Sequence, residues 1–260
     1  MKKMLLATSA LVLAGPAFAA DLRMPMKAPM VAAAPAYSWT GCYIGAQAGY
    51  GQGQKDFTDP GGAFPFAFAP AGTTVGVETQ GGLAGGQIGC NYQFAGGWVL
   101  GIEGEYAWAD IRGTVNDPFF AGKNGDPQTL SATTDGLGSV TGRLGYAFDR
   151  VLFYGKGGAA WAHDRYSMSL FPLGFAPAVG FNATETRAGW TVGVGLEYAF
   201  FDNWSVKVEY NHYDFGTRSI NLTNDAATIV PADIDQRIDT IKIGLNYRFW
   251  SAPAAVMARY

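Results

Sequence analysis

Two carboxylates are spaced so that they can share one site. Glu103 and Glu105 are two positions apart in a stretch, residues 98–111, that alternates apolar with polar or small residues. In an extended strand, side chains two positions apart point to the same face, so the two carboxylates lie side by side. Paired carboxylates can perform acid–base chemistry when their surroundings separate their pKa values. They can equally be the acidic half of a structural network of ion pairs.

Basic residues in similar stretches favour the structural interpretation. The charged residues that lie opposite the large apolar side chains of their own stretch are Glu103, Glu105, Arg143, Lys156, Glu197, Lys207, Glu209, Lys242 and Arg248. If the stretches close into one narrow barrel with this face inward, the nine ions fill its interior and pair with one another. Removing one partner of a buried pair costs about 3 to 5 kcal/mol, so pairing is strongly favoured. No nucleophile accompanies the glutamates, and we predict no enzyme activity.

Eight stretches with a period of two carry these residues and are the expected strands. They cover residues 37–51, 81–94, 98–111, 136–148, 151–163, 188–200, 204–215 and 237–249. The triplet Tyr-x-Phe closes four of them and is followed in three cases by a short turn. We expect the segments 52–80, 112–135, 164–187 and 216–236 to be long loops. Short turns on one side and long loops on the other are typical of bacterial outer-membrane barrels.

The apolar face of these stretches indicates contact with lipid. In residues 240–249, Ile241, Ile243 and Leu245 share one face with two aromatic residues, and the opposite face is polar or small. A charge-free outer face is required in a bilayer, where Arg or Lys costs about 2 to 4 kcal/mol at mid-membrane. Aromatic residues near both ends of the strands predict two interfacial girdles. The sequence therefore predicts an all-β fold, an eight-stranded antiparallel up-and-down transmembrane β-barrel with long extracellular loops and short periplasmic turns.

The amino-terminal region predicts export. Residues 1–19 have two lysines, a short apolar run and a small-x-small ending, which is the pattern of a secretory signal peptide cleaved after Ala19. Residues 20–36 contain three prolines and no glycine, and we expect an extended periplasmic arm, with an untethered leader as the alternative. Residues 37–249 are the predicted barrel and residues 250–260 a periplasmic extension, so both ends of the mature chain are predicted to be periplasmic. The formal net charge of −3 gives no reason to expect a nucleic-acid partner.

Cys42 and Cys90 lie in the first two expected strands, both on the lipid-side parity. One is early in an ascending strand and the other late in a descending one, so a symmetric hairpin sets them opposite each other. An exported protein meets an oxidising compartment, which favours a disulfide worth roughly 4 kcal/mol in the chain-entropy model. Two buried free thiols are the alternative, and a two-cysteine metal site lacks its other ligands.

His163 and His212 are the two histidines, each near the outer end of a strand. They could ligate a haem captured by the loops, or they are interfacial polar residues among aromatic neighbours. We favour the second interpretation. The sequence therefore predicts no metal site and no cofactor.

Several motifs resemble one family. Residues 39–45 (WTGCYIG), residues 244–249 (GLNYRF) and the ending VMARY are similar to those of the small outer-membrane immunogenic proteins of alphaproteobacteria, porin-family barrels related in architecture to the OmpA transmembrane domain. The resemblance implies an envelope protein with antigenic loops. In some relatives the mature amino terminus is joined to peptidoglycan, and Ala20-Asp21 matches that Ala-Asp start. Barrels of this kind usually end at an aromatic assembly signal, whereas eleven residues follow Phe249 here. We expect Tyr247 and Phe249 to serve as an internal signal, with Tyr260 as the alternative.

These observations predict a structural protein of the cell outer membrane. We expect a monomeric barrel that stabilises the envelope and is tethered through its mature amino terminus. The expected partners are outer-membrane lipid and lipopolysaccharide, the barrel-assembly machinery and peptidoglycan. A narrow porin, or a protein that binds haemin with its loops, is the alternative.

Overall fold

The computed structural model describes residues 37–61, 72–121, 127–170, 179–227 and 229–249. They belong to one compact unit, Pro35–Tyr260. The predicted signal peptide, the predicted arm and the predicted extension 250–260 lie outside the described residues. No helix in the described part of the chain is long and apolar enough to cross a membrane.

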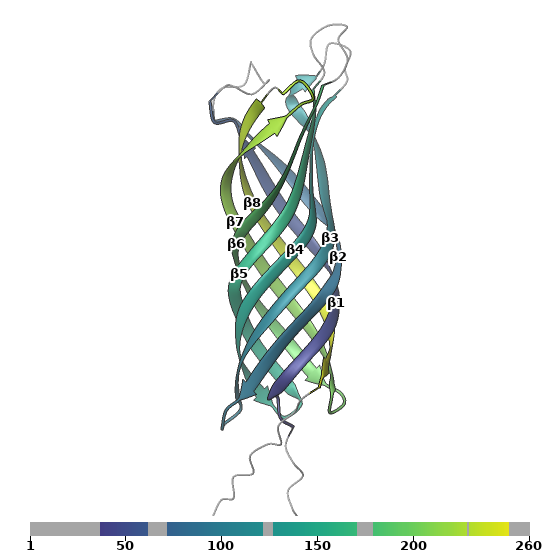
Figure 1. Cartoon of the computed structure of the whole chain (residues 1–260), viewed down its shortest axis with the longest axis vertical. Helices are drawn as coiled ribbons and strands as arrows, with labels where there is room; N and C mark the ends of the chain where they lie inside the picture. The colour runs from purple at the N-terminus through teal and green to yellow at the C-terminus, as the bar shows by residue number, and fades with distance from the viewer. Residues whose placement is uncertain (1–36, 62–71, 122–126, 171–178, 228, 250–260) are drawn as a thin grey trace, which may run out of the picture. The chain divides into compact units, whose positions relative to one another are not determined.

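Eight antiparallel strands form one closed barrel (Figure 1). Each strand pairs with its neighbours in the chain, and β1 closes the ring by pairing with β8. The strands are β1 (Gly41–Thr58), β2 (Thr74–Gln93), β3 (Trp98–Ala121), β4 (Pro127–Phe148), β5 (Val151–Leu170), β6 (Val179–Ala199), β7 (Trp204–Thr223) and β8 (Ile229–Arg248). The predicted fold class is confirmed. Closure leaves the barrel without the free sheet edges that an open sheet would expose to lipid.

The strands are longer than the sequence predicts, and most of the predicted loop residues belong to them. β1 continues seven residues past the expected end at residue 51, and β8 begins at Ile229 rather than at residue 237. The prediction of long loops at 52–80, 112–135, 164–187 and 216–236 is therefore wrong for most of the last three segments and for both ends of the first. The physical reason lies in the barrel wall, which continues beyond the membrane and has a second core of its own.

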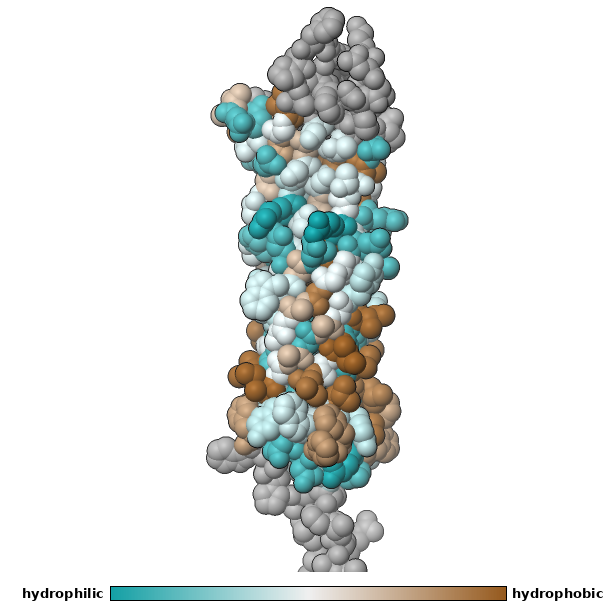
Figure 2. Space-filling model, turned by 90° about the vertical axis from the view of Figure 1, so that its right-hand side faces the viewer, coloured by the Kyte–Doolittle hydropathy of each residue, from teal (hydrophilic) through white to brown (hydrophobic). Residues whose placement is uncertain are grey.

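The lower half of the barrel has the predicted distribution of polarity. On β8, Ile241, Ile243 and Leu245 point outward and are 63%, 56% and 42% exposed, whereas Lys242 and Asn246 point inward and are buried. Among the described residues, no charged side chain lies on the outer surface of this half between the two aromatic girdles. Figure 2 shows the apolar side chains gathered in this half. This is the surface that acyl chains require.

The upper half reverses the polarity, and on β8 it does so without a change in which positions point inward. On β8, Asp235, Arg237 and Asp239 now point outward, and Ile234 and Ile238 point inward and are fully buried. The interior of the upper barrel holds an apolar cluster of Phe57, Val77, Leu130, Ala132, Tyr166, Met168, Phe181, Ile220, Leu222, Ala232 and Ile234. Water replaces acyl chains outside the wall at this height, so apolar side chains become more stable inside. Figure 2 shows hydrophilic side chains above the apolar band.

Exposed aromatic side chains mark the two borders of the apolar band. The lower girdle comprises Tyr92, Phe94, Trp98, Phe148, Tyr198, Phe200, Trp204, Tyr247 and Phe249, and the upper girdle comprises Tyr50, Trp108, Trp161, Trp190 and Tyr210. Amphipathic rings of this kind are favoured at the headgroup level of a bilayer. The girdles therefore define which part of the wall contacts hydrocarbon.

One part of the wall lacks a hydrogen-bonded ladder. β6 and β7 pair from Ala199 to Trp190 and again at Asn182, but no pairing joins residues 183–189 to residues 215–222, all of which the structure describes. This seam begins directly above Trp190 of the upper girdle. On its other side this stretch of β7 pairs with β8, with a bulge between Asp214 and Gly216, whose φ is 61°. Arg218 and Glu185 bridge the seam at 3.5 Å in place of backbone hydrogen bonds.

Candidate functional site in the barrel lumen

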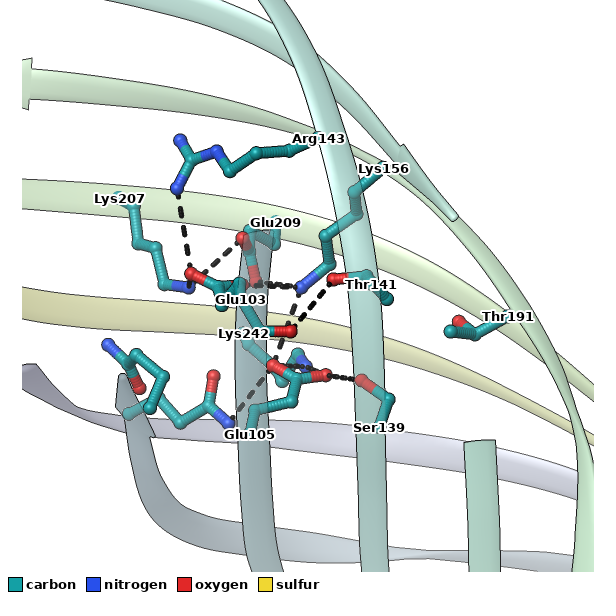
Figure 3. Close-up of polar contacts among 12 residues, drawn as sticks. Glu103, Glu105, Ser139, Thr141, Arg143, Lys156, Thr191, Lys207, Glu209 and Lys242 are labelled. Carbon is teal, nitrogen blue, oxygen red and sulfur yellow. Dashed lines mark hydrogen bonds and ion pairs between the residues drawn. The ribbon is translucent and has the colours of Figure 1, made fainter. Parts of the chain in front are cut away.

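Eight of the nine predicted interior charges form one cluster in the lower lumen, and Figure 3 labels all of them except Glu197. Strands β3 to β8 all contribute, because each has a polar residue at the inward parity at this height. The members of this cluster, called the lower charge cluster below, are Glu103, Glu105, Arg143, Lys156, Glu197, Lys207, Glu209 and Lys242. None is more than 6% exposed. Four acidic and four basic side chains make the cluster neutral as a whole.

Glu103 is contacted by four donor side chains. Lys156 Nζ donates to its Oε1 at 3.0 Å, and Lys207 Nζ donates to its Oε2 at 3.0 Å. Arg143 lies 3.5 Å from the same carboxylate, and the Tyr43 hydroxyl donates to Oε2 at 2.7 Å. Four donors around one carboxylate replace the water that burial removes.

Glu105 is coordinated by a different lysine. Lys242 Nζ lies 2.7 Å from both of its carboxylate oxygens. Ser139 and Tyr213 donate hydroxyl hydrogen bonds to Oε1 at 3.0 and 2.9 Å. Lys156 reaches Oε2 at 3.4 Å and so links this carboxylate to the rest of the cluster.

Lys156 and Lys207 join the cluster into one network. Lys156 Nζ contacts a third carboxylate, Glu209, at 3.1 Å, and Lys207 contacts Glu209 at 3.0 Å. Arg143 extends the network to Glu197, which it contacts at 2.9 Å. Figure 3 shows both lysines directed at Glu103 and Glu209. Removal of either lysine therefore affects more than one carboxylate.

Two tyrosines reach the cluster because glycines on neighbouring strands make room for their rings. Tyr154 donates to Glu209 Oε1 at 2.5 Å, and its ring lies where a Cβ on Gly195 would stand, 2.4 Å away. Tyr43 lies in the same way against Gly89, at 2.5 Å. The Arg143 guanidinium stacks over the Tyr154 ring at 3.8 Å. These glycines are therefore required by close packing inside the barrel.

The chemistry available to the cluster is ion pairing. Oxygen atoms of Glu103, Glu105 and Glu209 lie within 4.8 Å of one another, a spacing that a hard cation could use. Lys156 contacts all three carboxylates and occupies that position. Both oxygens of Glu105 contact Lys242, which disfavours its use as a base toward the Ser139 hydroxyl. The geometry fits neither a resident metal nor an activated nucleophile.

Arg248 lies inside the barrel but is not part of the cluster. It forms no ion pair with any described residue, and the predicted pairing of this residue with an interior carboxylate does not occur. Its guanidinium donates to the Tyr37 hydroxyl at 2.7 Å and to the Ser38 carbonyl at 2.9 Å, and it stacks on Trp39. Residues 37–40 are not part of β1, contrary to prediction. They turn into the barrel mouth, where burial raises the pKa of the Tyr37 phenol.

Trp39 closes the lower end of the lumen. It is fully buried, its indole Nε1 donates to the Asp149 carbonyl at 3.0 Å, and its backbone nitrogen donates to Gln93 at 2.7 Å. Around it is an apolar cluster that includes Val99 and Leu152. This end of the barrel is therefore plugged by residues that precede the first strand.

A second interior ion pair lies in the upper barrel and was missed by the sequence analysis. Lys55 Nζ contacts Asp164 Oδ1 at 2.6 Å, and both side chains are fully buried. Arg187 is also fully buried, donates to the Ile234 carbonyl at 2.8 Å, and has no described hydrogen-bond partner at Nη2. All three residues fall in segments predicted to be loops. The signal that could have found them is the period of two, which continues through these segments with the apolar face turned inward.

The structure describes the predicted disulfide and assembly-signal residues but not the predicted tether residues. Cys42 and Cys90 are paired across β1 and β2 and form a disulfide. Tyr247 and Phe249 lie in the lower girdle. Ala20 and Asp21 lie outside the described residues.

The two histidines are held separately on the outer wall. His163 on β5 lies 3.0 Å from the Thr186 hydroxyl, and His212 on β7 lies 2.8 Å from Asp239. β6 runs between their strands. Each imidazole therefore has its own polar neighbour.

Known proteins with similar sequences include outer-membrane immunogenic proteins. A family model described as the outer membrane protein beta-barrel domain matches residues 7–249. The chain is 36% identical over 253 residues to the 31 kDa outer-membrane immunogenic protein of Brucella melitensis biotype 1, covering 96% of this chain and 100% of that one. It is 29% identical over 255 residues to the 25 kDa outer-membrane immunogenic protein of Brucella abortus biovar 1, covering 96% and 99%.

Two solved structures with similar folds have low sequence identity. The attachment invasion locus protein Ail of Yersinia pestis, in complex with the heparin analogue sucrose octasulfate, is 15% identical with a TM-score of 0.37, covering 80% of this chain and 99% of that chain. Neisserial surface protein A is 16% identical with a TM-score of 0.38, covering 81% and 98%.

Proposed function

Because the chain belongs to the outer membrane protein beta-barrel family and lies in the cell outer membrane, we propose that it is a non-conducting, non-enzymatic barrel that stabilises the envelope and is tethered to peptidoglycan. The observation that carries the proposal is the lower charge cluster. Eight buried ions paired across six strands stabilise the barrel from inside and occupy the space that a solute would need.

The lumen supports this proposal along its whole described height. Its side chains form alternating apolar and ionic layers. The inward-pointing residues of β5 belong to these layers one after another from the lower end. These are Leu152 and Tyr154, then Lys156, then Ala160 and Ala162, then Asp164, and finally Tyr166 and Met168. A narrow eight-stranded barrel is wide enough only for its own side chains. A hydrated ion would have to displace both the layers and the ion pairs.

Single-channel recording in planar lipid bilayers tests the non-conducting barrel. We expect reconstituted protein to give no sustained open level, with a general porin in the same bilayers as the positive control. Insertion is checked by the faster migration of the folded, unheated protein in a detergent gel. A reproducible conductance in inserted protein would support the narrow-porin alternative and overturn this part of the proposal.

The proposed tether rests on the amino-terminal sequence. Residues 20–36 carry three prolines, and an extended proline-rich arm of this length reaches roughly 50 Å at about 3.1 Å per residue. Cleavage after Ala19 would make Ala20 the first residue, followed by Asp21. A free α-amino group at Ala20 can accept the acyl group of a peptidoglycan stem peptide by transpeptidation, in which a peptide bond of the stem breaks, its terminal residue leaves, and the new amide bond to Ala20 forms.

Mass spectrometry of muramidase-digested sacculi tests the tether. We expect an amino-terminal peptide whose Ala20 carries a muropeptide. A matched variant, Asp21→Ala, should reduce the modified fraction without changing the amount of folded barrel. Unmodified Ala20 in all sacculus-associated protein would remove the tether and leave the non-conducting barrel untouched.

A further inference from the structure

A polar pocket lies on the outer wall directly above the upper girdle. Its volume is about 770 Å³, and strands β7, β8, β1, β2 and β3 contribute to its lining. Its lining includes six outward-pointing polar or charged side chains, those of Gln52, Gln54, Glu78, Gln80, Arg237 and Asp239. The lower charge cluster and the lumen plug use none of these residues.

The strand register arranges these side chains in two rows. In the lower row, Gln52 lies between Asp239 on β8 and Gln80 on β2. In the upper row, Gln54 lies between Arg237 and Glu78. Strands are about 4.8 Å apart and alternate side chains about 7 Å apart, so the rows form a regular polar grid.

The grid combines hydrogen-bond donors and acceptors at separations of about 5 to 7 Å, which hydroxyl groups on opposite sides of one sugar ring span. Glu78 and Asp239 only accept when ionised, Arg237 only donates, and the three glutamine amides do both. Asp239 is already oriented, because Tyr210 donates to it at 2.6 Å and His212 lies 2.8 Å away. A sugar ring has several hydroxyl groups, each of which can donate and accept, so it can form hydrogen bonds with both the donors and the acceptors of the grid. The two carboxylates disfavour a phosphate at this position, so sugar hydroxyls occupy the grid and any phosphate of the ligand lies outside it.

The residues below the grid indicate where the ligand comes from. In the next row down, Ile241 lies between Tyr210 and Tyr50, two residues of the upper girdle. Tyr50 donates to Gln80 at 3.0 Å, which joins the girdle to the pocket. Ile241 in this row and Ile243 below it are 63% and 56% exposed on the lipid-facing wall. A molecule with acyl chains against these isoleucines would place its headgroup in the grid.

We propose that this pocket, called the outer-wall pocket below, binds a saccharide, and that its occupant is the sugar headgroup of an outer-leaflet glycolipid. The proposal rests on the outer-membrane location and is independent of the tether and of conductance. A soluble oligosaccharide has the same hydroxyl chemistry but no acyl chains to use the apolar wall beneath.

A matched pair of double variants tests the proposal. Gln54→Ala/Arg237→Ala removes one cross-strand pair of the grid. Arg165→Ala/Thr184→Ala is the control. It removes a cross-strand pair on another part of the wall, with the same change in charge. Arg165 lies on β5, two residues above His163. All four side chains point outward, and we expect both variants to fold. Folding is confirmed by heat-dependent gel migration.

The first experiment measures retained glycolipid. Each protein is reconstituted in nanodiscs of phospholipid and rough lipopolysaccharide, released into mild detergent, and weighed by native mass spectrometry. We expect bound lipopolysaccharide on the wild type and on the control variant, and at least a fivefold lower bound fraction on Gln54→Ala/Arg237→Ala. Equal bound fractions on all three proteins would overturn the proposal.

The second experiment distinguishes the source of the saccharide. Core oligosaccharide without acyl chains is titrated into the same proteins in detergent and followed by isothermal calorimetry. We expect binding at least tenfold weaker than that of intact lipopolysaccharide. Equal affinity for the free oligosaccharide, lost in the grid variant, would overturn the glycolipid as occupant and support a soluble saccharide at the same pocket.

Discussion

Replacement of Lys156 by methionine tests whether the lower charge cluster holds the barrel together. Lys156 Nζ lies within 3.4 Å of three buried carboxylates, those of Glu103, Glu105 and Glu209. Methionine has a similar length and no charge, so Lys156→Met leaves four acidic and three basic side chains in a cluster that is neutral in the wild type. The remaining excess negative charge cannot reach water, because every member is buried.

We expect the lost free energy of unfolding to be about 3 kcal/mol, the lower end of the cost of removing one partner from a buried pair. The lower end applies because Lys207 and Lys242 still contact the same carboxylates. A second substitution, Glu209→Gln, restores neutrality and keeps an oxygen that Tyr154 can donate to. The double variant should therefore recover at least half of the loss.

The assay is equilibrium unfolding in urea with lipid vesicles, followed by tryptophan fluorescence. Arg112→Met is the control, because Arg112 pairs with Asp110 on the exposed wall and we expect no measurable change there. A Lys156→Met protein as stable as the wild type would refute the reasoning. So would a double variant no more stable than the single one, because the cluster would then not act as a network of charges.

Three further predictions use the same preparation. Cys42→Ser should lower the free energy of unfolding by up to about 4 kcal/mol, and reductant should produce the same loss in the wild type but none in the variant. Gly195→Val should cost about 1 to 3 kcal/mol through its clash with Tyr154, whereas Gly142→Val, which faces open space, should cost nothing measurable. In hydrogen exchange, the amides of residues 183–189 that point toward β7 should exchange faster than amides of β5 at the same height, because the seam has no ladder; equal protection would contradict the unpaired register.

The correct predictions depend on local patterns. The period of two in residues 240–249 determines which side chains of that strand share a face, whatever the strand packs against. Eight such stretches with short turns on one side lead to a closed barrel, because no other arrangement satisfies the backbone in lipid. The pairing of Cys42 with Cys90 also follows from one hairpin and its symmetry.

The sequence alone did not determine the height of the wall or the partners of its ions. Above the upper girdle the alternation continues, but the solvent outside changes from acyl chains to water, so residues such as Ile234 and Ile238 turn inward while Asp235 turns outward. If apolar residues are assumed to face outward everywhere, the upper parts of these strands do not fit the pattern and are predicted to be loops. The partner of each ion depends on the register of all eight strands, and for this reason only the tertiary structure places Lys55 against Asp164.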